Sequence, residues 1–321
     1  MAKGARKLNE LVSKLDVIVE VRDSRAPAST SSPLIKALAK IKPVIHVLSR
    51  KDLADPEKLA LWMNALKHTY SADLRKREGL SAIRKAILKF KPEHREVRLA
   101  VVGIPNVGKS LLLNSLIGKA NAGVGNIPGI TKSVSWYRND GMLIVDSPGI
   151  LDPHAEAGAH LILSWLGCAK AEVVGGWENA ALGLIRFLKA KGMSEVLPVE
   201  SVCGNTSSPS RESIDRNTPS LSRESINGAC VDGNTPPSRE SIDRNTPSPS
   251  RESINAAIPA LTLEAIGRKY GCLISGGRIN MELAGQKFIE AFSSGRLGKI
   301  CLELPNEERA IDFRDEAADI V

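Results

Sequence analysis

The octapeptide GIPNVGKS, residues 103–110, has the residue types and spacing that can hold the phosphates of a nucleotide. It fits the pattern Gly-x4-Gly-Lys-Ser, with a strand-like run before it (VRLAVV) and a helix-like run after it (KSLLLNSLIG). Glycines let main-chain N–H groups approach phosphates, and a helix N-terminus adds the positive end of its dipole. We expect Lys109 to reach the β- and γ-phosphates and Ser110 to ligate Mg²⁺, in a loop formed by Asn106, Val107 and Gly108.

Two further segments provide groups for a metal and a γ-phosphate. DSPG, residues 146–149, ends the apolar run MLIVD, which would place Asp146 beside Mg²⁺ and the amide of Gly149 near the γ-phosphate. PGITK precedes it, and Thr131 in that loop would complete the Mg²⁺ shell when the γ-phosphate is present. Loss of the phosphate would release the loop, a switch that favours a regulated NTPase over a metabolic kinase.

VLSRKD, residues 47–52, provides groups that suit a purine base. The carboxylate of Asp52 only accepts hydrogen bonds; guanine offers it N1–H and an amine, whereas adenine would leave the charge unpaired. We expect Ser49 and Arg50 to contact the base too, and Ser71 and Ala72 to offer guanine O6 a main-chain N–H. An aspartate that merely caps a helix or turn is the alternative for Asp52.

These loops need a sheet to position them. Strand-like runs at 16–21, 43–48, 97–103 and 142–146 alternate with helical patterns, which predicts a mostly parallel sheet with helices on both faces. Ligands of such sheets lie at the carboxyl ends of the strands, where all three loops fall. Residues 2–15 predict an amphipathic helix with Leu8, Leu11, Val12 and Leu15 on one side.

Helical patterns dominate beyond about residue 155. One apolar stripe contains Ala181, Leu184, Ile185 and Leu188, and another contains Ala284, Phe288, Ala291 and Phe292. Between them SRES recurs four times in a segment rich in Ser, Pro and Asn without aromatic residues, so we expect a disordered insertion at 203–256. The predicted domains are a nucleotide-binding domain at 1–165 and a helical domain at 166–321 interrupted by that insertion.

Composition narrows the class of protein. The 321 residues contain no apolar run of membrane-spanning length, and the five cysteines form no CxxC pair. We therefore expect a cytoplasmic protein with reduced thiols and no membrane partner. The net charge of +8 suits a polyanionic partner such as nucleic acid, although many proteins of this charge bind none.

We call VLSRKD, residues 47–52, the base loop and GIPNVGKS, residues 103–110, the phosphate loop. The order SRKD, SA, GIPNVGKS, PGIT, DSPG resembles that of circularly permuted GTPases, because the base loop precedes the phosphate loop. The chain is most similar to the ribosome biogenesis GTPase A (YlqF-type) family. MAKGARKL, EVRDSRAP and the C-terminal stretches IGRKYGCLISGGRIN and FSSGRLGKICLELP carry the resemblance beyond the loops. It implies a permuted P-loop GTPase domain, with a mostly parallel α/β sheet, followed by a small all-helical RNA-binding domain.

The resemblance also implies the parts of the reaction. Asp52 would read guanine, Lys109, Thr131 and Gly149 would act in hydrolysis, and Ser110, Thr131 and Asp146 would hold Mg²⁺. Asn106 would help to ligate K⁺. The cofactors would thus be GTP or GDP, Mg²⁺ and K⁺, and the partner a precursor of the large ribosomal subunit, bound by a monomer. Candidate contacts to rRNA, each equally interpretable as a solvated helix face, are Arg186, Lys189, Lys191, Arg268, Lys269, Arg296 and Lys299.

The sequence departs from the usual pattern of GTPases in three places. Ser49 replaces the asparagine of Asn-Lys-x-Asp, so we expect a weaker but retained guanine preference. Ile150 follows DSPG where Ras-like enzymes have a water-orienting glutamine, a feature that the family shares. The third concerns a histidine that the family usually carries just before Met-Ala-Lys, whereas the sequence here begins at that Met.

The sequence therefore predicts a slow GTPase that assembles the large ribosomal subunit and is stimulated by the bound particle. A nucleotide-binding scaffold with little or no hydrolysis is the alternative from another class. An ATP-using P-loop enzyme is a third.

Overall fold

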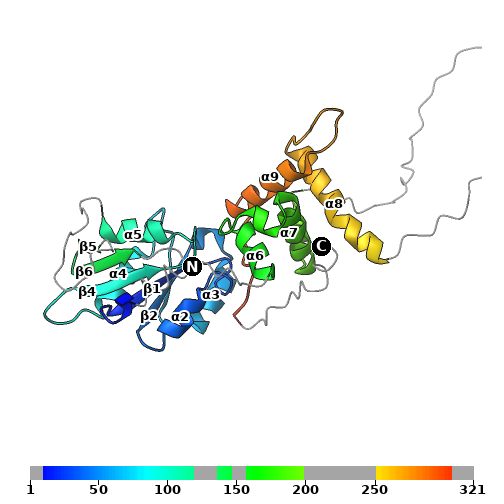
Figure 1. Cartoon of the computed structure of the whole chain (residues 1–321). Helices are drawn as coiled ribbons and strands as arrows, with labels where there is room; N and C mark the ends of the chain where they lie inside the picture. The colour runs from blue at the N-terminus through cyan, green and yellow to red at the C-terminus, as the bar shows by residue number, and fades with distance from the viewer. Residues whose placement is uncertain (1–9, 119–135, 147–156, 199–250, 306–321) are drawn as a thin grey trace, which may run out of the picture. The chain divides into compact units, whose positions relative to one another are not determined.

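The computed structural model describes residues 10–118, 136–146, 157–198 and 251–305. By its contacts the chain divides into two compact units, Met1–Val199 with Ile258–Val321, and Glu200–Ala257. Apart from residues 251–257, the described residues belong to the first unit (Figure 1). No helix in these described ranges combines the length and the hydrophobicity needed to cross a bilayer.

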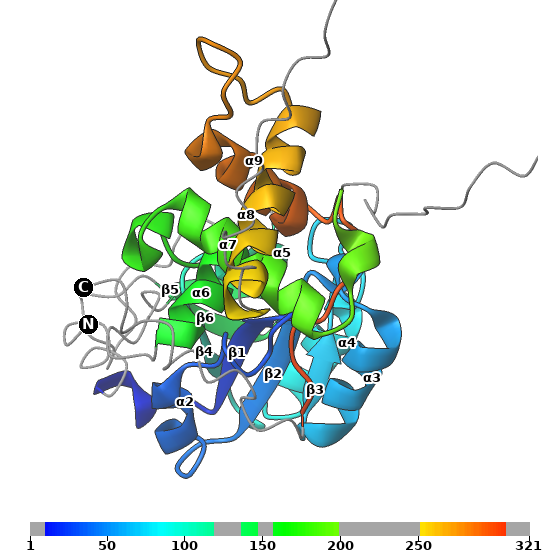
Figure 2. The same ribbon diagram turned by 90° about the vertical axis from the view of Figure 1, so that its right-hand side faces the viewer.

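A six-stranded sheet forms the first part of the chain. Its order is β3-β2-β1-β4-β6-β5, and every neighbouring pair is parallel except β5 with β6. β1 therefore lies between β2 and β4, as Figure 2 shows. The strands are β1 (Val17–Asp23), β2 (Val44–Ser49), β3 (Thr69–Ser71), β4 (Val97–Val102), β5 (Trp136–Asn139) and β6 (Met142–Asp146).

Helices cover both faces of this sheet, because successive side chains of a strand point to opposite faces. Val17, Val19 and Val21 of β1 belong to the core formed with α4 (Leu80–Leu88) and α5 (Lys109–Ile117). Ile18 belongs to a second core, with α2 (Pro33–Leu38) and the helical segment at 10–12. α3 (Pro56–Ala65) packs through Leu59 and Trp62 beside the short helix η1 (Lys51–Leu53).

The second part of the described chain is helical. It contains α6 (Ala157–Trp165), η2 (Ala171–Val174), α7 (Trp177–Ala190), η3 (Ser194–Val196), α8 (Arg251–Lys269) and α9 (Met281–Ser293). Trp165 at the end of α6 stacks at a tilt on Phe187 of α7, with ring centroids 5.4 Å apart, and its Nε1–H donates to the Ala180 oxygen at 2.7 Å. Gly285 of α9 lets that helix approach the main chain of Trp177 at the start of α7.

The structure confirms the predicted α/β class with a mostly parallel sheet, the permuted order of its loops and the helical C-terminal region. All four predicted strands are present, and both predicted apolar stripes are buried in α7 and α9. Residues 251–256, at the C-terminal end of the predicted insertion, lie in α8. The other repeats lie outside the described residues, as does Leu8.

Candidate nucleotide site

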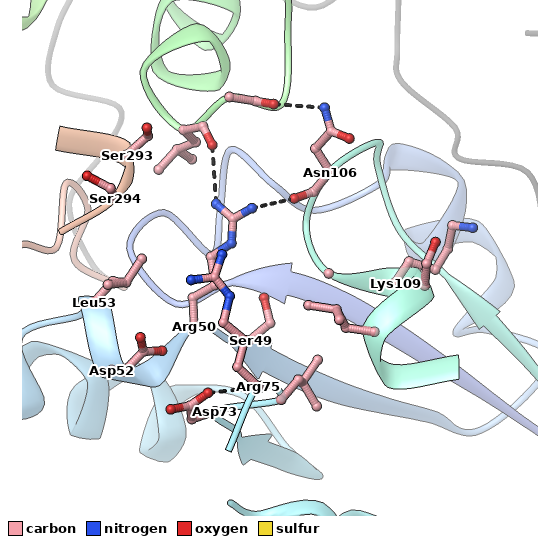
Figure 3. Close-up of a pocket in the computed structure, with 16 residues that line it drawn as sticks. Ser49, Arg50, Asp52, Leu53, Asp73, Arg75, Asn106, Lys109, Ser293 and Ser294 are labelled. Atoms are coloured by element: carbon pink, nitrogen blue, oxygen red, sulfur yellow. Dashed lines mark hydrogen bonds between the residues drawn. The ribbon is translucent and has the colours of Figure 1, made fainter. Parts of the chain in front are cut away.

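The base loop and the phosphate loop, far apart in the chain, meet at one edge of the sheet. The base loop follows β2, the phosphate loop follows β4, and β1 lies between these two strands. A cavity of about 520 Å³ opens between the loops (Figure 3). It is lined by Ser49, Arg50, Asp52, Leu53, Asp73, Leu74, Arg75, Asn106, Gly108, Lys109, Ser110, Leu111, Leu166, Gly167, Ser293 and Ser294.

The phosphate loop has the conformation that its glycines permit. α5 begins at Lys109, directly after Gly108, whose φ of 99° favours glycine. Val107 is fully buried and anchors the loop to the core, while Ser110 is exposed on the first turn of α5. The N-terminus of α5 thus faces the cavity with unpaired N–H groups, which suits an anion.

Lys109 and Asp146 form an ion pair at the phosphate end. The Nζ of Lys109 lies 2.8 Å from Oδ1 of Asp146, the last residue of β6. The lysine side chain is 12% exposed and the aspartate 42% exposed, so a ligand can reach both. A γ-phosphate would interact more strongly with Lys109 than Asp146 does, and a divalent cation would interact more strongly with Asp146 than Lys109 does.

Ser49 connects the base loop to the phosphate loop. Its hydroxyl lies 2.5 Å from the main-chain oxygen of Val107 and 3.0 Å from that of Arg22, and its single hydrogen can serve only one of them at a time. The residue is 1% exposed. Ser49 therefore holds the two loops together, and its predicted contact with a base stays a prediction.

Arg50 crosses the middle of the site. Its guanidinium donates to the main-chain oxygen of Asn106 at 2.7 Å and to that of Leu166 at 3.3 Å (Figure 3). It also donates to Oδ2 of Asp23 at 3.1 Å. The residue has a φ of 56°. Its head group is thus fixed by the phosphate loop, by the end of β1 and by the turn after α6, which leaves its stem beside the cavity.

Asp52 lies at the other end of the cavity from Lys109, in η1. Its carboxylate makes no hydrogen bond or ion pair within the described part of the chain. The cap of the neighbouring helix α3 is Asp55, which accepts from the N–H groups of Glu57 and Lys58. Asp52 is therefore not the helix cap of the alternative interpretation, and its acceptor atoms remain available to a ligand.

Ser71 and Ala72 do not line this cavity. Ala72 is fully buried, and its N–H donates to the Leu48 oxygen at 2.8 Å, extending the pairing of β2 with β3. That N–H is paired in this structure, and the predicted donation from Ser71 or Ala72 to guanine O6 stays a prediction. Asp73, Leu74 and Arg75, directly after it, do line the cavity.

Asn106 has a φ of 62°, and its Nδ2 donates to the oxygen of Gly167 at 2.9 Å. Its amide oxygen is the atom that remains for a cation. Two other predicted site residues, Thr131 and Gly149, lie outside the described residues, as does Ile150.

The sequence did not reveal a buried charge cluster behind the base loop. Arg25 binds Asp23 through two contacts, of 3.0 and 2.9 Å, and Arg50 binds the same carboxylate. Burial would raise the pKa of Asp23, but the charge and hydrogen bonds of Arg25, and the charge of Arg50, hold that pKa below its ordinary value. EVRDSRAP contains Asp23 and Arg25 two positions apart, which is the signal that the sequence offers.

Residues from the helical region also line the cavity, and no motif predicted them. Leu166 and Gly167 come from the turn after α6, and Ser293 and Ser294 from the end of α9. Arg25 donates to the Ser293 oxygen at 3.2 Å and lies 5.6 Å from the ring centre of Phe292. The candidate nucleotide site is therefore built from both parts of the chain.

Comparisons with known proteins agree with this geometry. A family model described as a 50S ribosome-binding GTPase matches residues 98–176, which include the phosphate loop. The ribosome biogenesis GTPase A of Priestia megaterium is 34% identical over 206 residues, which cover 59% of this chain and 71% of that protein. The chain belongs to the ribosome biogenesis GTPase A family.

Other relatives extend the match over nearly the whole chain. The ribosome biogenesis GTPase A of Bacillus cereus is 27% identical over 324 residues, covering 96% of this chain and 92% of that protein. The solved structure of GNP-bound YlqF from T. maritima has the same fold, with a TM-score of 0.60 and 21% identity over 95% of this chain and all of that one.

Membership of the ribosome biogenesis GTPase A family settles the class of reaction. The chain is a GTPase, and it binds guanine nucleotides. The family supports the predicted GTP-hydrolysing assembly factor, and it does not support a scaffold without hydrolysis.

Proposed function

We propose that the chain binds GTP between Asp52 and the N-terminus of α5, and hydrolyses it while it assembles the large ribosomal subunit. The observation that carries the proposal is the cavity itself. A carboxylate that has no partner among the described residues marks one end, and a lysine with a helix N-terminus marks the other. These are the chemical groups that the two ends of a guanine nucleotide require.

At the base end, Asp52 would accept hydrogen bonds from guanine N1–H and the exocyclic amine. The stem of Arg50 would lie along the base, since its head group is held by Asn106, Asp23 and Leu166. Ser49 would contribute indirectly by joining the loops. Guanine preference would then depend mainly on Asp52, because the Ser49 hydroxyl contacts main-chain oxygens and the Ala72 N–H is paired.

At the phosphate end, Lys109 would exchange Asp146 for the β- and γ-phosphates. The Ser110 hydroxyl and the Asp146 carboxylate are oxygen ligands of the kind that Mg²⁺ prefers, so these residues fit the ion. Thr131 would complete the shell. Mg²⁺ would neutralise the charge that develops on the phosphate oxygens. The amide oxygen of Asn106 would be a K⁺ ligand, because its Nδ2 already donates to Gly167.

For hydrolysis, Lys109, Thr131 and the amide of Gly149 would hold the transferring phosphoryl group. Ile150 cannot orient the attacking water as a glutamine does. Intrinsic turnover should consequently be slow, and the bound particle should supply the missing group. A gain of roughly 10³- to 10⁵-fold, the range known for arginine fingers, sets the scale of that stimulation.

The proposed partner is rRNA within a precursor of the large subunit, bound by the helical region. Of the seven basic candidates, five are exposed: Arg186, Arg268, Lys269, Arg296 and Lys299. Lys189 differs, because its Nζ lies 2.9 Å from the Thr262 hydroxyl of α8 and burial lowers its pKa. We assign Lys189 to helix packing, and propose the exposed residues as phosphate contacts.

The proposal also includes a monomeric protein that acts in the cytoplasm, and a division into a GTPase domain at 1–165 and a helical domain at 166–321.

Steady-state GTP hydrolysis in potassium buffer, with and without purified large subunits, tests the function. We expect slow turnover alone and strong stimulation by large subunits, with small subunits as the matched control. Replacing potassium by sodium should lower the stimulated rate, and Asn106→Ala should remove that difference. Equal rates with large and small subunits would contradict the proposed partner.

A further inference from the structure

The C-terminal region of the chain contacts the segment after the base loop at Leu53, the residue that follows Asp52. Gly295, two residues beyond α9, lies so close to Leu53 that a Cβ at this glycine would be 2.5 Å from the Leu53 Cδ2. The main-chain oxygen of Leu53 accepts from the N–H of Ile300 at 3.1 Å. Figure 3 shows Leu53 on the wall of the cavity between Asp52 and Ser294.

The segment Ile300–Glu303 is anchored on both sides of this contact. The Leu302 N–H donates to the Arg25 oxygen at 2.7 Å, and Cys301 is buried with Leu48 and Ala54. The Glu303 carboxylate accepts from the N–H groups of Ala28, at 2.8 Å, and Ser29, at 3.1 Å. The Glu303 main-chain oxygen accepts from Trp62 Nε1 of α3 at 3.0 Å. The segment therefore runs along the base loop with several fixed points.

The position of Asp52 depends on the chain segments on either side of it. η1 contains only three residues, and so short a helix has little stability of its own. The Asp52 carboxylate has no protein partner in the described ranges. Its position consequently depends on fixed neighbours on both sides. Before it, the Lys51 N–H donates to the Ala72 oxygen at 3.2 Å and the Lys51 ammonium lies 2.8 Å from the Glu78 carboxylate; after it, Leu53 is held by Ile300.

We propose that Gly295 and the segment Ile300–Glu303 are positioning elements for guanine recognition, which keep Asp52 in place through Leu53. The inference rests on the proposed role of Asp52 and adds the helical region to base recognition. Coupling between two binding events is reciprocal. A partner that displaces this segment must therefore weaken guanine nucleotide binding, and bound nucleotide must strengthen the contact of the segment with Leu53. Contact with the ribosomal particle would thereby be linked to nucleotide release.

Two glycines of one loop give a matched pair of variants. Gly295 has a φ of 80° and Gly298 a φ of 101°, so an alanine is strained at either position. Only at Gly295 does the added methyl meet Leu53, whereas at Gly298 no atom lies within 4 Å of it. Comparing Gly295→Ala with Gly298→Ala therefore isolates the contact with Leu53 from the strain of the main chain.

The measurement is the dissociation rate of a fluorescent GDP analogue from the full chain after a chase with unlabelled GDP. We expect Gly295→Ala to accelerate release at least ~5-fold, the lower end of ordinary coupling between sites, and Gly298→Ala to change it less than about 2-fold. In an Asp52→Ala background the effect of Gly295→Ala should largely disappear, because the position of Asp52 no longer matters.

Leu53→Ala breaks the same contact without straining the main chain, and it should also accelerate release. It therefore tests the inference even where Gly295→Ala fails to fold. Equal release rates for folded Gly295→Ala, Leu53→Ala and Gly298→Ala would overturn the inference, as would an undiminished effect in the Asp52→Ala background. An unaltered chain that binds no GDP would overturn the proposed function, and the inference with it.

Discussion

The Ser49 hydroxyl lies 2.5 Å from the main-chain oxygen of Val107, so the loop after β2 and the loop after β4 form one structural unit. The strand between them contributes to the same junction, since the Arg22 oxygen is the second acceptor, at 3.0 Å. A serine here joins the loops through one hydrogen. Ser49, at the position of the asparagine of Asn-Lys-x-Asp, thus links the base and phosphate sites.

Ser49→Ala should destabilise the protein by about 1 to 2 kcal/mol, because the Val107 carbonyl loses the hydroxyl that donates to it. We also expect weaker GDP binding, since the two loops lose a direct connection. Denaturant unfolding and calorimetric titration with GDP measure the two effects. Ser81→Ala, on an exposed position of α4, is the control and should change neither.

Asp52→Asn should exchange GTP preference for preference for xanthosine triphosphate. The amide offers a donor to the additional carbonyl of xanthine, and it no longer accepts two hydrogen bonds from guanine. Competition of both nucleotides against a fluorescent GDP analogue measures the preference. Unchanged affinity for GTP in this variant would refute the assignment of Asp52 to the base.

Lys109→Ala should weaken GTP binding by about 10- to 150-fold, which corresponds to roughly 1.5 to 3 kcal/mol for a hydrogen bond to a charged group. Hydrolysis should fall further, because the lysine contacts the phosphate that is transferred. Lys85→Ala, exposed on α4, carries the same change of charge and should bind GTP normally. A binding loss as large in the control would point to long-range charge rather than contact.

Asp23→Asn should cost about 3 to 5 kcal/mol of stability at pH 7, because two arginines lose the carboxylate that they share in a buried site. The pKa of Asp23 is lowered from 3.8, so its contribution is present above about pH 4 and is lost as the pH falls through the lowered value. The unaltered protein should lose this stability on acidification, and the variant should not. Urea midpoints between pH 7 and pH 3 give the comparison.

Gly285→Ala should destabilise the helical region by about 1 to 3 kcal/mol, because the new methyl would meet main-chain atoms of Trp177 and Glu178 at 2.7 and 2.9 Å. Gly183→Ala on α7 should change stability less, since its methyl meets only side-chain atoms of Leu161 and Trp165, at 3.3 Å. Thermal unfolding compares them. An equal loss in both variants would exclude the close approach of α9 to α7 as the cause.

The features that could be predicted from the sequence are those that short motifs and local hydrophobic patterns determine. The phosphate loop, Asp52 and the four inner strands follow from short motifs and buried apolar runs. β3 and β5 were missed because each is short, lies at an edge of the sheet and is only partly buried. The contact of Leu53 with Gly295 joins residues that share no motif or period, so only the folded chain reveals it.

The central place of β1 has a consequence for synthesis. Val17 of β1 pairs with Leu99 of β4, so the middle ladder of the sheet can form only after both strands have left the ribosome. The ladder of β1 with β2 needs far less chain, and the base loop is therefore complete while the phosphate loop is still unmade. Such late, long-range pairing slows folding. A nascent copy of this ribosome-assembling GTPase would thus hold half of its nucleotide site, unable to gain stability from GTP, until β4 is inserted beside β1.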